Sequence, residues 1–305
     1  MGNALFISKK QNTLGPSRTL IIGEPGSGKT RLAATWPEPL FLDSEFGAGS
    51  TGANRMLVRP GPEALPILDG TLKKLSNARY EDGALWIQIE DEDIPVRTLV
   101  IDSIDAFQQG EKQRIMKENR RTTMQMQDWG TLLDRMTPIM HTWSGLPIHV
   151  VVIAHVKESS PDDSSMGQVG LAVQGGFKDA MPRWFDYILH LRGRDRENRM
   201  VFTQPVVVSN VKYLAKDRHG TFNTLLEDEK AYFQIEEVDN LPERKVADLI
   251  RKRHVLGGEE GDEGRGFAGE RTKAELLRIA REEVDMDANK LAEVLKENGI
   301  GSFDV

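Results

Sequence analysis

Gly23 to Thr30 read GEPGSGKT, and this segment has the clearest chemistry in the sequence. Its glycines (Gly23, Gly26 and Gly28) allow the backbone to curl so that N–H groups point at phosphate oxygens. In such a loop, the Lys29 ammonium neutralises the β- and γ-phosphates and the Thr30 hydroxyl binds Mg²⁺. The whole loop, including Glu24, Pro25 and Ser27, is therefore predicted to bind a nucleoside triphosphate, ATP, together with Mg²⁺.

An acidic residue at the end of a buried strand forms the second part of such a site. Thr98 to Asp102, TLVID, is a continuous β-rich run that ends in an acid. We expect this strand beside the one before the loop, with Asp102 holding Mg²⁺ through water; alternatively, Asp102 only ends a strand. Ser103 follows where many ATPases carry a glutamate, so the residue that activates water must come from another segment.

The elements that position these residues can be read from the hydrophobic pattern. Arg18 to Ile22 is predicted as a strand, Lys29 to Trp36 begins a helix, and Ile148 to Ala154 is another buried strand. Strands alternate with helices early in the chain and follow one another after Trp184. This order predicts an α/β fold with a mainly parallel central sheet and an antiparallel extension.

The composition is that of a soluble globular protein with one large core and a small accessory module. The chain has 305 residues, of which 39% are hydrophobic, and a net charge of −7. This charge argues against non-specific nucleic-acid binding by the whole surface. The absence of cysteine excludes disulfides and thiolate metal sites. No apolar run approaches the roughly 20 residues of a membrane span, so we expect no membrane association and a cytoplasmic protein.

Four parts are predicted along the chain. Residues 1–17 form an N-terminal arm and residues 18–256 the nucleotide-binding domain. Residues 257–269, GGEEGDEGRGFAG, have the composition of an acidic flexible linker. Residues 270–305 begin with capping-box spacing and continue with apolar residues at helical intervals, which predicts a small helical hairpin.

Three further segments resemble the core of RecA-type recombinases and the related RadA and DnaB proteins. LFLDSEFG, residues 40–47, resembles the strand and turn in which a RecA-type glutamate polarises the attacking water. Glu45 occupies that place, with Asp43 as the fallback base. VVIAHV, residues 151–156, resembles the strand that ends in a γ-phosphate sensor, where His155 replaces the glutamine of RecA. The alternatives are a solvated turn glutamate and an ordinary histidine.

LAKDRHG, residues 214–220, resembles the KxRxG segment of hexameric DnaB helicases and a similar motif of RadA. In those proteins a lysine and an arginine reach across a subunit interface to the neighbour's γ-phosphate. Lys216 and Arg218 match these positions, and an arginine fork donates well to phosphate oxygens. The alternative is a charged hairpin turn.

Together with GEPGSGKT and TLVIDSID, these segments look like the small phage RecA-like ATPases of the Sak single-strand-annealing type, over residues 18–222. The resemblance implies a DNA-stimulated ATPase that forms a ring or filament of identical subunits on single-stranded DNA. It also implies strand annealing or homologous recombination, a single-strand-binding protein as a further partner, and a bacterial host's cytoplasm. The alternatives are a DnaB- or RadA-like translocase or helicase and a nucleotide-switched adaptor.

Two segments are candidates for the DNA contact. Lys157 to Lys178 is rich in glycine and serine, and we expect a long loop that is mobile until it binds a ligand. Lys112 to Arg121, KQRIMKENRR, carries five basic residues against one acid. A solvated helix face is an equally good interpretation of this second segment.

Overall fold

The computed structural model describes residues 14–89, 92–159, 167–193, 200–208, 210–222, 232–234, 250 and 253–254. The chain divides into two compact units, Met1–Gly261 and Asp262–Val305, and all described residues belong to the first. Most of the predicted N-terminal arm, the acidic linker and the helical hairpin therefore lie outside the described residues.

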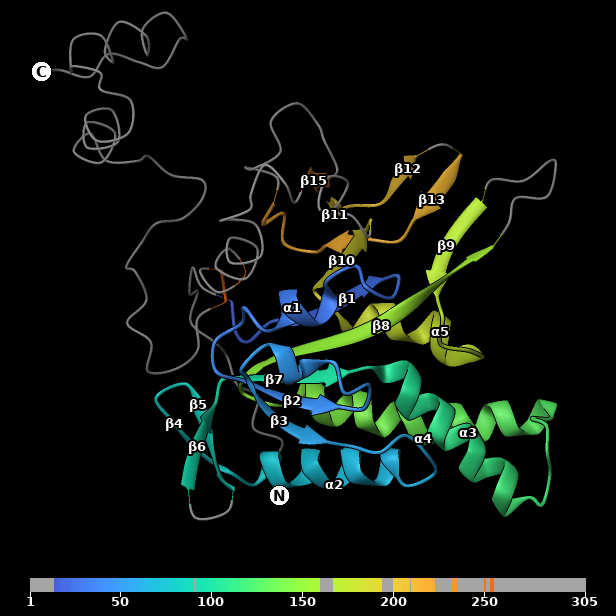
Figure 1. Ribbon diagram of the computed structural model, residues 1–305, viewed down its shortest axis with the longest axis horizontal. Helices are drawn as coiled ribbons and strands as arrows, with labels where there is room; N and C mark the ends of the chain where they lie inside the picture. The colour runs from blue at the N-terminus through green and yellow to red at the C-terminus, as the bar shows by residue number, and fades with distance from the viewer. Residues whose placement is uncertain are drawn as a thin grey trace, which may run out of the picture. The chain divides into compact units, whose positions relative to one another are not determined.

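A mainly parallel sheet forms the centre of the fold (Figure 1). Its parallel strands are β3 (Asn54–Leu57), β2 (Pro39–Asp43), β7 (Thr98–Asp102), β8 (His149–Ser159), β1 (Arg18–Gly23) and β10 (Tyr187–Arg192), in this spatial order. The expectation that the strand ending in Asp102 lies beside β1 was wrong, because β8 is inserted between them. Hydrophobic runs identify buried strands but contain no information on their order.

Antiparallel strands extend this sheet at the carboxyl ends of the parallel strands and beyond β10. β9 (Gly167–Leu171) pairs antiparallel with the end of β8. β13 (Val211–Tyr213) pairs in parallel with β9 and antiparallel with β12 (Val206–Val208). β11 (Met200–Phe202) and the short β14 (Lys216–Asp217) pair with β10, and β15 (Tyr232–Gln234) pairs with β11. The predicted fold class, α/β with an antiparallel extension, is confirmed.

The helices flank the parallel sheet. α2 (Ala64–Ser76), α3 (Ile104–Glu118) and α4 (Met126–Ser144) lie on one face, and α1 (Lys29–Ala33) lies on the other (Figure 1). α5 (Gly176–Ala180) follows β9, and a separate antiparallel sheet contains β4 (Arg79–Glu81), β5 (Ala84–Ile89) and β6 (Glu92–Val96). In the described part of the chain, no helix has the length and apolarity to cross a membrane.

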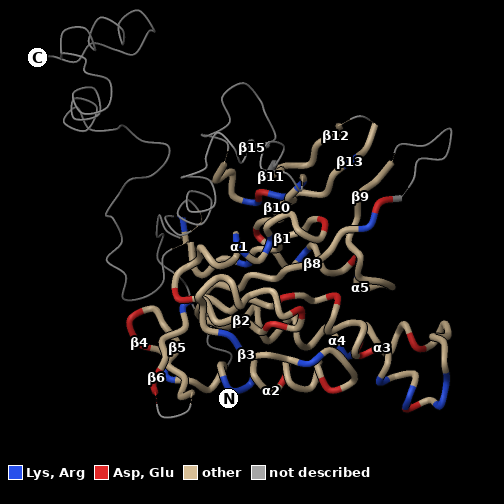
Figure 2. Tube along the Cα trace, viewed as in Figure 1, with Lys and Arg blue, Asp and Glu red and all other residues tan. Residues whose placement is uncertain are grey.

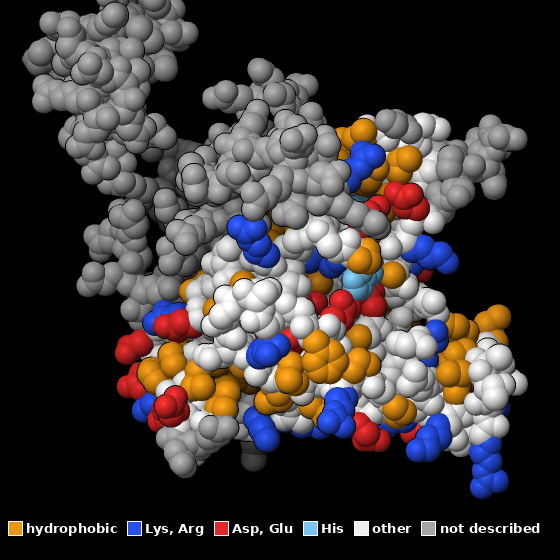
Figure 3. All heavy atoms as spheres, in the orientation of Figure 1, with side chains coloured by type: hydrophobic (Ala, Val, Ile, Leu, Met, Phe, Trp, Pro, Cys, Tyr) orange, Lys and Arg blue, Asp and Glu red, His pale blue; other side chains and the backbone are white. Residues whose placement is uncertain are grey.

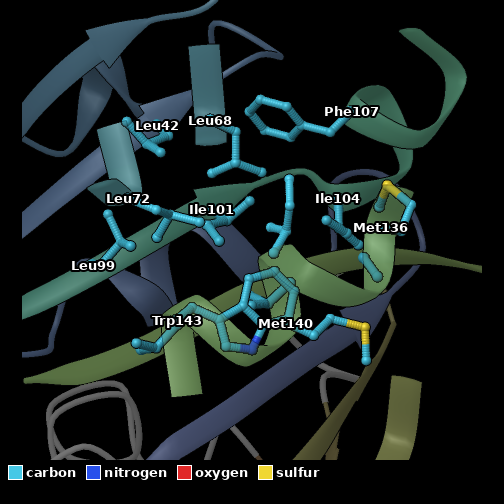
Figure 4. Packing of buried hydrophobic residues seen from close by; sticks show 14 of the residues in the cluster. Leu42, Leu68, Leu72, Leu99, Ile101, Ile104, Phe107, Met136, Met140 and Trp143 are labelled. Atoms are coloured by element: carbon cyan, nitrogen blue, oxygen red, sulfur yellow. The ribbon is translucent and has the colours of Figure 1, made fainter. Parts of the chain in front are cut away.

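The central strands are buried on both faces, which explains their uninterrupted apolar sequences. In β7, Leu99 and Ile101 pack with the α2–α4 side, whereas Val100 packs with the α1 side. Figure 4 shows Leu99 and Ile101 among side chains of α2, α3 and α4, including Leu72, Phe107 and Trp143. Each such burial contributes about 1.5–3 kcal/mol, so the core holds the strand ends in fixed positions.

A buried arginine fixes the start of β1. The Arg18 guanidinium donates hydrogen bonds to five backbone carbonyl groups. Three of them lie at the end of α4 and in the residues before β8, namely Ser144, Leu146 and Ile148. The other two belong to the preceding residues, Pro16 and Ser17. Burial lowers the pKa of Arg18 to about 10, and it still remains charged at neutral pH. A cation at a helix C-terminus satisfies carbonyl groups that have no partner within the helix.

The segment from Lys157 to Lys178 is not the long loop that we expected. β8 continues to Ser159, residues 167–171 form β9, and residues 176–180 form α5. Val169, Leu171, Val173 and Phe177 are buried, so alternate apolar residues hidden among glycines specify these elements. Residues 160–166 lie outside the described residues.

The basic segment from Lys112 to Arg121 is largely tied into the fold. Arg114 contacts Glu111 and Glu118, and Arg121 contacts Asp128 at the start of α4. Lys112 donates a hydrogen bond to the Gln174 side chain. Figure 2 shows acidic and basic positions interspersed along α3 and α4. This pattern favours the helix-face interpretation over a DNA-binding track.

Candidate nucleotide-binding site

The predicted phosphate loop connects the carboxyl end of β1 to α1. Gly28, directly before the helix, has a φ of 96°, in the left-handed region that favours glycine. At Gly23, a Cβ atom would clash with the Leu191 carbonyl oxygen of β10, so no larger residue fits there. These two glycines set the path of the loop. The helix is shorter than expected, ending at Ala33.

Lys29 is held inside this loop. Its Nζ donates hydrogen bonds to the carbonyl oxygens of Gly23 and Glu24, at 3.1 and 2.9 Å. Burial lowers the pKa of Lys29, while the negative charges of Glu45, Asp102 and Asp105 act in the opposite direction. Among the described residues, no carboxylate is within ion-pair distance of this ammonium group. A buried cation of this kind fits the phosphates of a nucleotide.

Thr30 of α1 and Asp102 of β7 meet although β1, which leads into α1, is not a neighbour of β7 in the sheet. The Thr30 Oγ1 donates a hydrogen bond to Asp102 Oδ2 at 2.7 Å. Asp102 is 1% exposed, and burial raises its pKa to about 6, with Glu45 and Asp43 adding to the effect and Thr30 opposing it. A hydroxyl and a carboxylate at this distance are the hard oxygen donors that Mg²⁺ prefers. A bound dication would favour the ionised carboxylate.

The segment LFLDSEFG forms β2 and a tight turn that presents Glu45. Asp43 accepts hydrogen bonds from the backbone N–H groups of Glu45, Gly47 and Ala48, at 3.2, 3.2 and 3.0 Å. Both Asp43 oxygens are therefore used to hold the turn, so Glu45 is the better candidate base. Ser44 donates a hydrogen bond to the Asp102 carbonyl at 2.9 Å and thus ties the ends of β2 and β7 together.

Glu45 and His155 lie next to each other across these strand ends. His155 Nδ1 is 3.4 Å from Glu45 Oε1, and the Ser103 hydroxyl donates a hydrogen bond to the same oxygen. His155 is also opposite Gly23 in the β1–β8 pairing, which places it beside the phosphate loop. A histidine with acidic side chains gathered next to it is visible on the face presented in Figure 3. The sequence-predicted residues Lys29, Thr30, Asp102, Glu45 and His155 thus come together.

Two polar residues of this group were not among the predicted site residues. Ser103 was noted only because it is not a glutamate, yet its hydroxyl contacts Glu45. Asp105 lies in the first turn of α3 and contacts His155. Ligand-type atoms of Glu45, Asp105 and His155 all lie within 4.8 Å of one another. Their positions along the sequence give no signal of this proximity except that Asp105 closely follows Asp102.

Lys216 and Arg218 lie away from the phosphate loop of their own chain. β14 pairs with Tyr187 and Ile188 at the start of β10, whereas Gly23 pairs with Leu191 near its end. Lys216 pairs with Ile188, and the Arg218 N–H donates to the Asp186 carbonyl oxygen. At about 3.3 Å per residue, these positions are about 10 Å and about 16 Å from Leu191 along the strand. Lys216 Nζ donates to the carbonyl oxygens of Pro182 and Phe185, and Arg218 forms an ion pair with Asp186 at 2.9 Å.

Comparisons with known proteins identify the nucleotide-binding part. The sequence family described as "AAA domain" matches residues 16–219. Among solved structures, one described as "Crystal structure of the RadB recombinase" is similar, with 16% sequence identity and a TM-score of 0.34; it covers 62% of this chain and 81% of that chain. No curated protein matches the sequence.

Proposed function

Because the chain belongs to the AAA-domain family and is a P-loop ATPase, we propose that it couples Mg-ATP hydrolysis to the handling of single-stranded DNA. In this proposal, identical subunits assemble as a ring or filament on the strand. ATP binding holds neighbouring subunits together, and hydrolysis loosens their interface and releases DNA. The biological outcome is strand annealing or homologous recombination in a phage that replicates in the bacterial cytoplasm.

The observation that carries the hydrolytic part is the meeting of Lys29, Thr30, Asp102 and Glu45 at one edge of the sheet. Thr30 and Asp102 would hold Mg²⁺, which, when bound, neutralises charge on the β- and γ-phosphates. Lys29 adds its positive charge from within the loop. Glu45, held by the Asp43 turn, polarises the attacking water as a general base.

The position of Lys216 and Arg218 supports a site shared between subunits. These side chains are near the start of β10, where Lys216 donates to the carbonyl oxygens of Pro182 and Phe185 and Arg218 pairs with Asp186. If they act on a γ-phosphate, it is that of a neighbouring copy, as the DnaB-like motif implies. Arg218 is suited to this role because its side chain is 46% exposed and an arginine fork matches the geometry of phosphate oxygens.

DNA binding and annealing depend on the resemblance to phage RecA-like ATPases of the Sak type, which extends over residues 18–222. A single-strand-binding protein is the natural further partner, since it occupies the same strands. The decisive measurement is ATP turnover with and without single-stranded DNA, together with particle imaging. We expect stimulation by DNA and rings or filaments on it. An ATP turnover rate that is unchanged by single-stranded DNA, together with only monomeric particles in the images, would contradict the proposal.

An unwinding assay separates annealing from translocation. A forked duplex and a pair of complementary single strands are each incubated with the protein and ATP. The annealing proposal expects the complementary strands to pair and the fork to persist. ATP-driven displacement of the forked strand would instead identify a helicase of the DnaB or RadA kind.

A mixing experiment tests the shared site. Subunits with Arg218→Ala and subunits with Glu45→Gln are each expected to be inactive alone. Mixed assemblies contain interfaces in which an intact Glu45 faces an intact Arg218, so part of the ATPase activity should return. No recovery at any ratio, although both variants assemble, would refute the intersubunit role. The melting temperature of Arg218→Ala serves as the control, because Arg218 also contacts Asp186 within its own chain.

A further inference from the structure

Asp105 makes two contacts with one residue of β8. Its Oδ2 accepts a hydrogen bond from the His155 backbone N–H at 2.7 Å and lies 3.1 Å from His155 Nδ1. Asp105 comes from the first turn of α3, so one carboxylate joins the helix after β7 to the strand that ends beside the phosphate loop. A carboxylate that holds both the backbone and the ring fixes the position and the orientation of the imidazole.

The sheet itself explains why Asp105 is needed there. β7 pairs with β8 as far as Ile153, and β9 pairs with β8 from Val156 onward. His155 lies between these two paired segments. A buried backbone N–H without a partner is costly, and Asp105 supplies the acceptor at the gap.

The ring contact determines which nitrogen faces a ligand. With the Nδ1 proton donated to Asp105, the other nitrogen, Nε2, makes no hydrogen bond within the described part of the chain. In neutral histidine this Nε2 would be an acceptor, which is unsuited to a phosphate oxygen. In the imidazolium form it becomes a donor. A carboxylate on Nδ1 favours that form.

We propose that Asp105 is a positioning residue that holds His155 with Nδ1 towards its carboxylate and Nε2–H towards the γ-phosphate of bound ATP. The inference rests on the proposed ATPase function and deepens it. In its protonated, cationic form, His155 thereby donates a hydrogen bond to the γ-phosphate. RecA-type proteins have a neutral glutamine at the corresponding position. Asp105 acts only through His155 and does not touch the nucleotide.

The charges around the ring are consistent with this role. Three charged groups face His155: Asp105 of α3, Glu45 of the turn after β2, and Lys29 at the start of α1. The hydrogen bond from Asp105 is the largest influence and raises the pKa of His155, with Glu45 adding to it. Burial and Lys29 act in the opposite direction. Without the Asp105 charge, the balance moves towards the neutral ring.

Asp105→Asn is the variant that tests this. Asparagine retains an oxygen for the His155 backbone N–H but has no charge for the ring. Loss of this charge lowers the pKa of His155, so less imidazolium remains at alkaline pH, and kcat there should fall about tenfold. ATP affinity should change little, because Lys29 and the loop are intact. The alkaline limb of the kcat–pH profile should move to lower pH.

Two controls separate positioning from a general structural effect. Asp134→Asn replaces an exposed acid of α4 and should leave both the rate and the pH profile unchanged. In the background of His155→Gln, Asp105→Asn should have no further effect on kcat, because Asp105 acts on the nucleotide only through the His155 ring. Equal losses from Asp105→Asn with and without His155 would overturn the inference.

Nitrogen-15 NMR of the wild-type histidines gives a readout that needs neither a variant nor turnover. With Mg²⁺ and ATPγS, which is hydrolysed slowly, we expect the His155 Nε2 resonance to move to the protonated position while Nδ1 stays hydrogen-bonded. A His155 Nε2 chemical shift that is the same with and without the nucleotide would overturn the inference. A protein that shows this change but no DNA-stimulated turnover would instead contradict the DNA part of the proposed function alone.

Discussion

Asp102 is predicted to reduce the stability of the nucleotide-free protein, and replacing it with asparagine should reveal this cost. Its side chain is buried, and its pKa is raised from the ordinary 3.8 to about 6, chiefly by burial. In asparagine, the side-chain oxygen can still accept the hydrogen bond from Thr30. The substitution therefore removes a buried charge while it retains the shape and the main contact.

The magnitude follows from the linkage between protonation and folding. A pKa of 3.8 in the unfolded chain and about 6 in the folded protein corresponds to about 3 kcal/mol. Below pH 3.8 the carboxyl group is protonated in both the folded and the unfolded state, so the free energy of unfolding is not reduced. As the pH rises from 3.8 through 6, the unfolded chain ionises first and the folded protein loses this stability. Above 6 the loss is complete.

Urea denaturation of the wild-type protein and of Asp102→Asn, in EDTA and without nucleotide, measures the difference in their free energies of unfolding. At pH 8, we expect the variant to have a free energy of unfolding up to about 3 kcal/mol higher than wild type. The difference should shrink towards zero near pH 4. Asp43→Asn is the matched control, because Asp43 is equally buried but accepts three backbone hydrogen bonds. That variant should lose about 1–3 kcal/mol.

A variant Asp102→Asn that is no more stable than wild type at pH 8 would refute the reasoning. So would a difference that stays constant from pH 4 to pH 8, because a buried titrating charge requires a pH-dependent one. Added Mg-ATP should reverse the order of stability. Bound Mg-ATP stabilises the folded wild type by mass action. The variant lacks the carboxylate charge that would hold Mg²⁺, so it should gain less stability from the ligand.

Three further outcomes are expected. Lys29→Ala should abolish tight ATP binding in isothermal calorimetry, because a buried cation of the loop is removed; unchanged affinity would disprove the phosphate-loop assignment. Glu45→Gln should retain ATP binding but lower kcat by about 10²–10⁴, as for loss of a general base, and an unaltered single-turnover rate would exclude that role. Arg18→Met should lower the free energy of unfolding by more than about 3 kcal/mol, since five carbonyl contacts are lost; a urea midpoint equal to that of wild type would contradict this.

Local sequence was sufficient for those parts of the site that depend on backbone shape and on burial. GEPGSGKT identified the phosphate loop because left-handed and close-approach positions require glycine, as Gly28 and Gly23 confirm. TLVID identified a doubly buried strand because its apolar residues are continuous. The α/β class followed from the alternation of such strands with helices.

Two features could not be predicted from the sequence. Glycine and serine obscured a weak apolar pattern in one segment, and the spatial order of the strands in the sheet is not encoded in their local sequences. β9 and α5 were mistaken for a loop, although Leu171 and Phe177 are buried within them. The insertion of β8 between β1 and β7 depends on the path of α3 and α4 across the sheet, which no local period records.

Reading the residues alone was therefore enough to predict a triphosphate-binding loop, a buried acid and a nearby glutamate in one α/β domain. The contacts that these residues make depend on the packed fold. Asp105 meets His155 because β7 ends earlier than β8 and leaves a backbone N–H to satisfy. Asp43 holds a turn while Glu45 is presented. These pairings arise from strand length and sheet order, which are properties of the packed whole and not of any single segment.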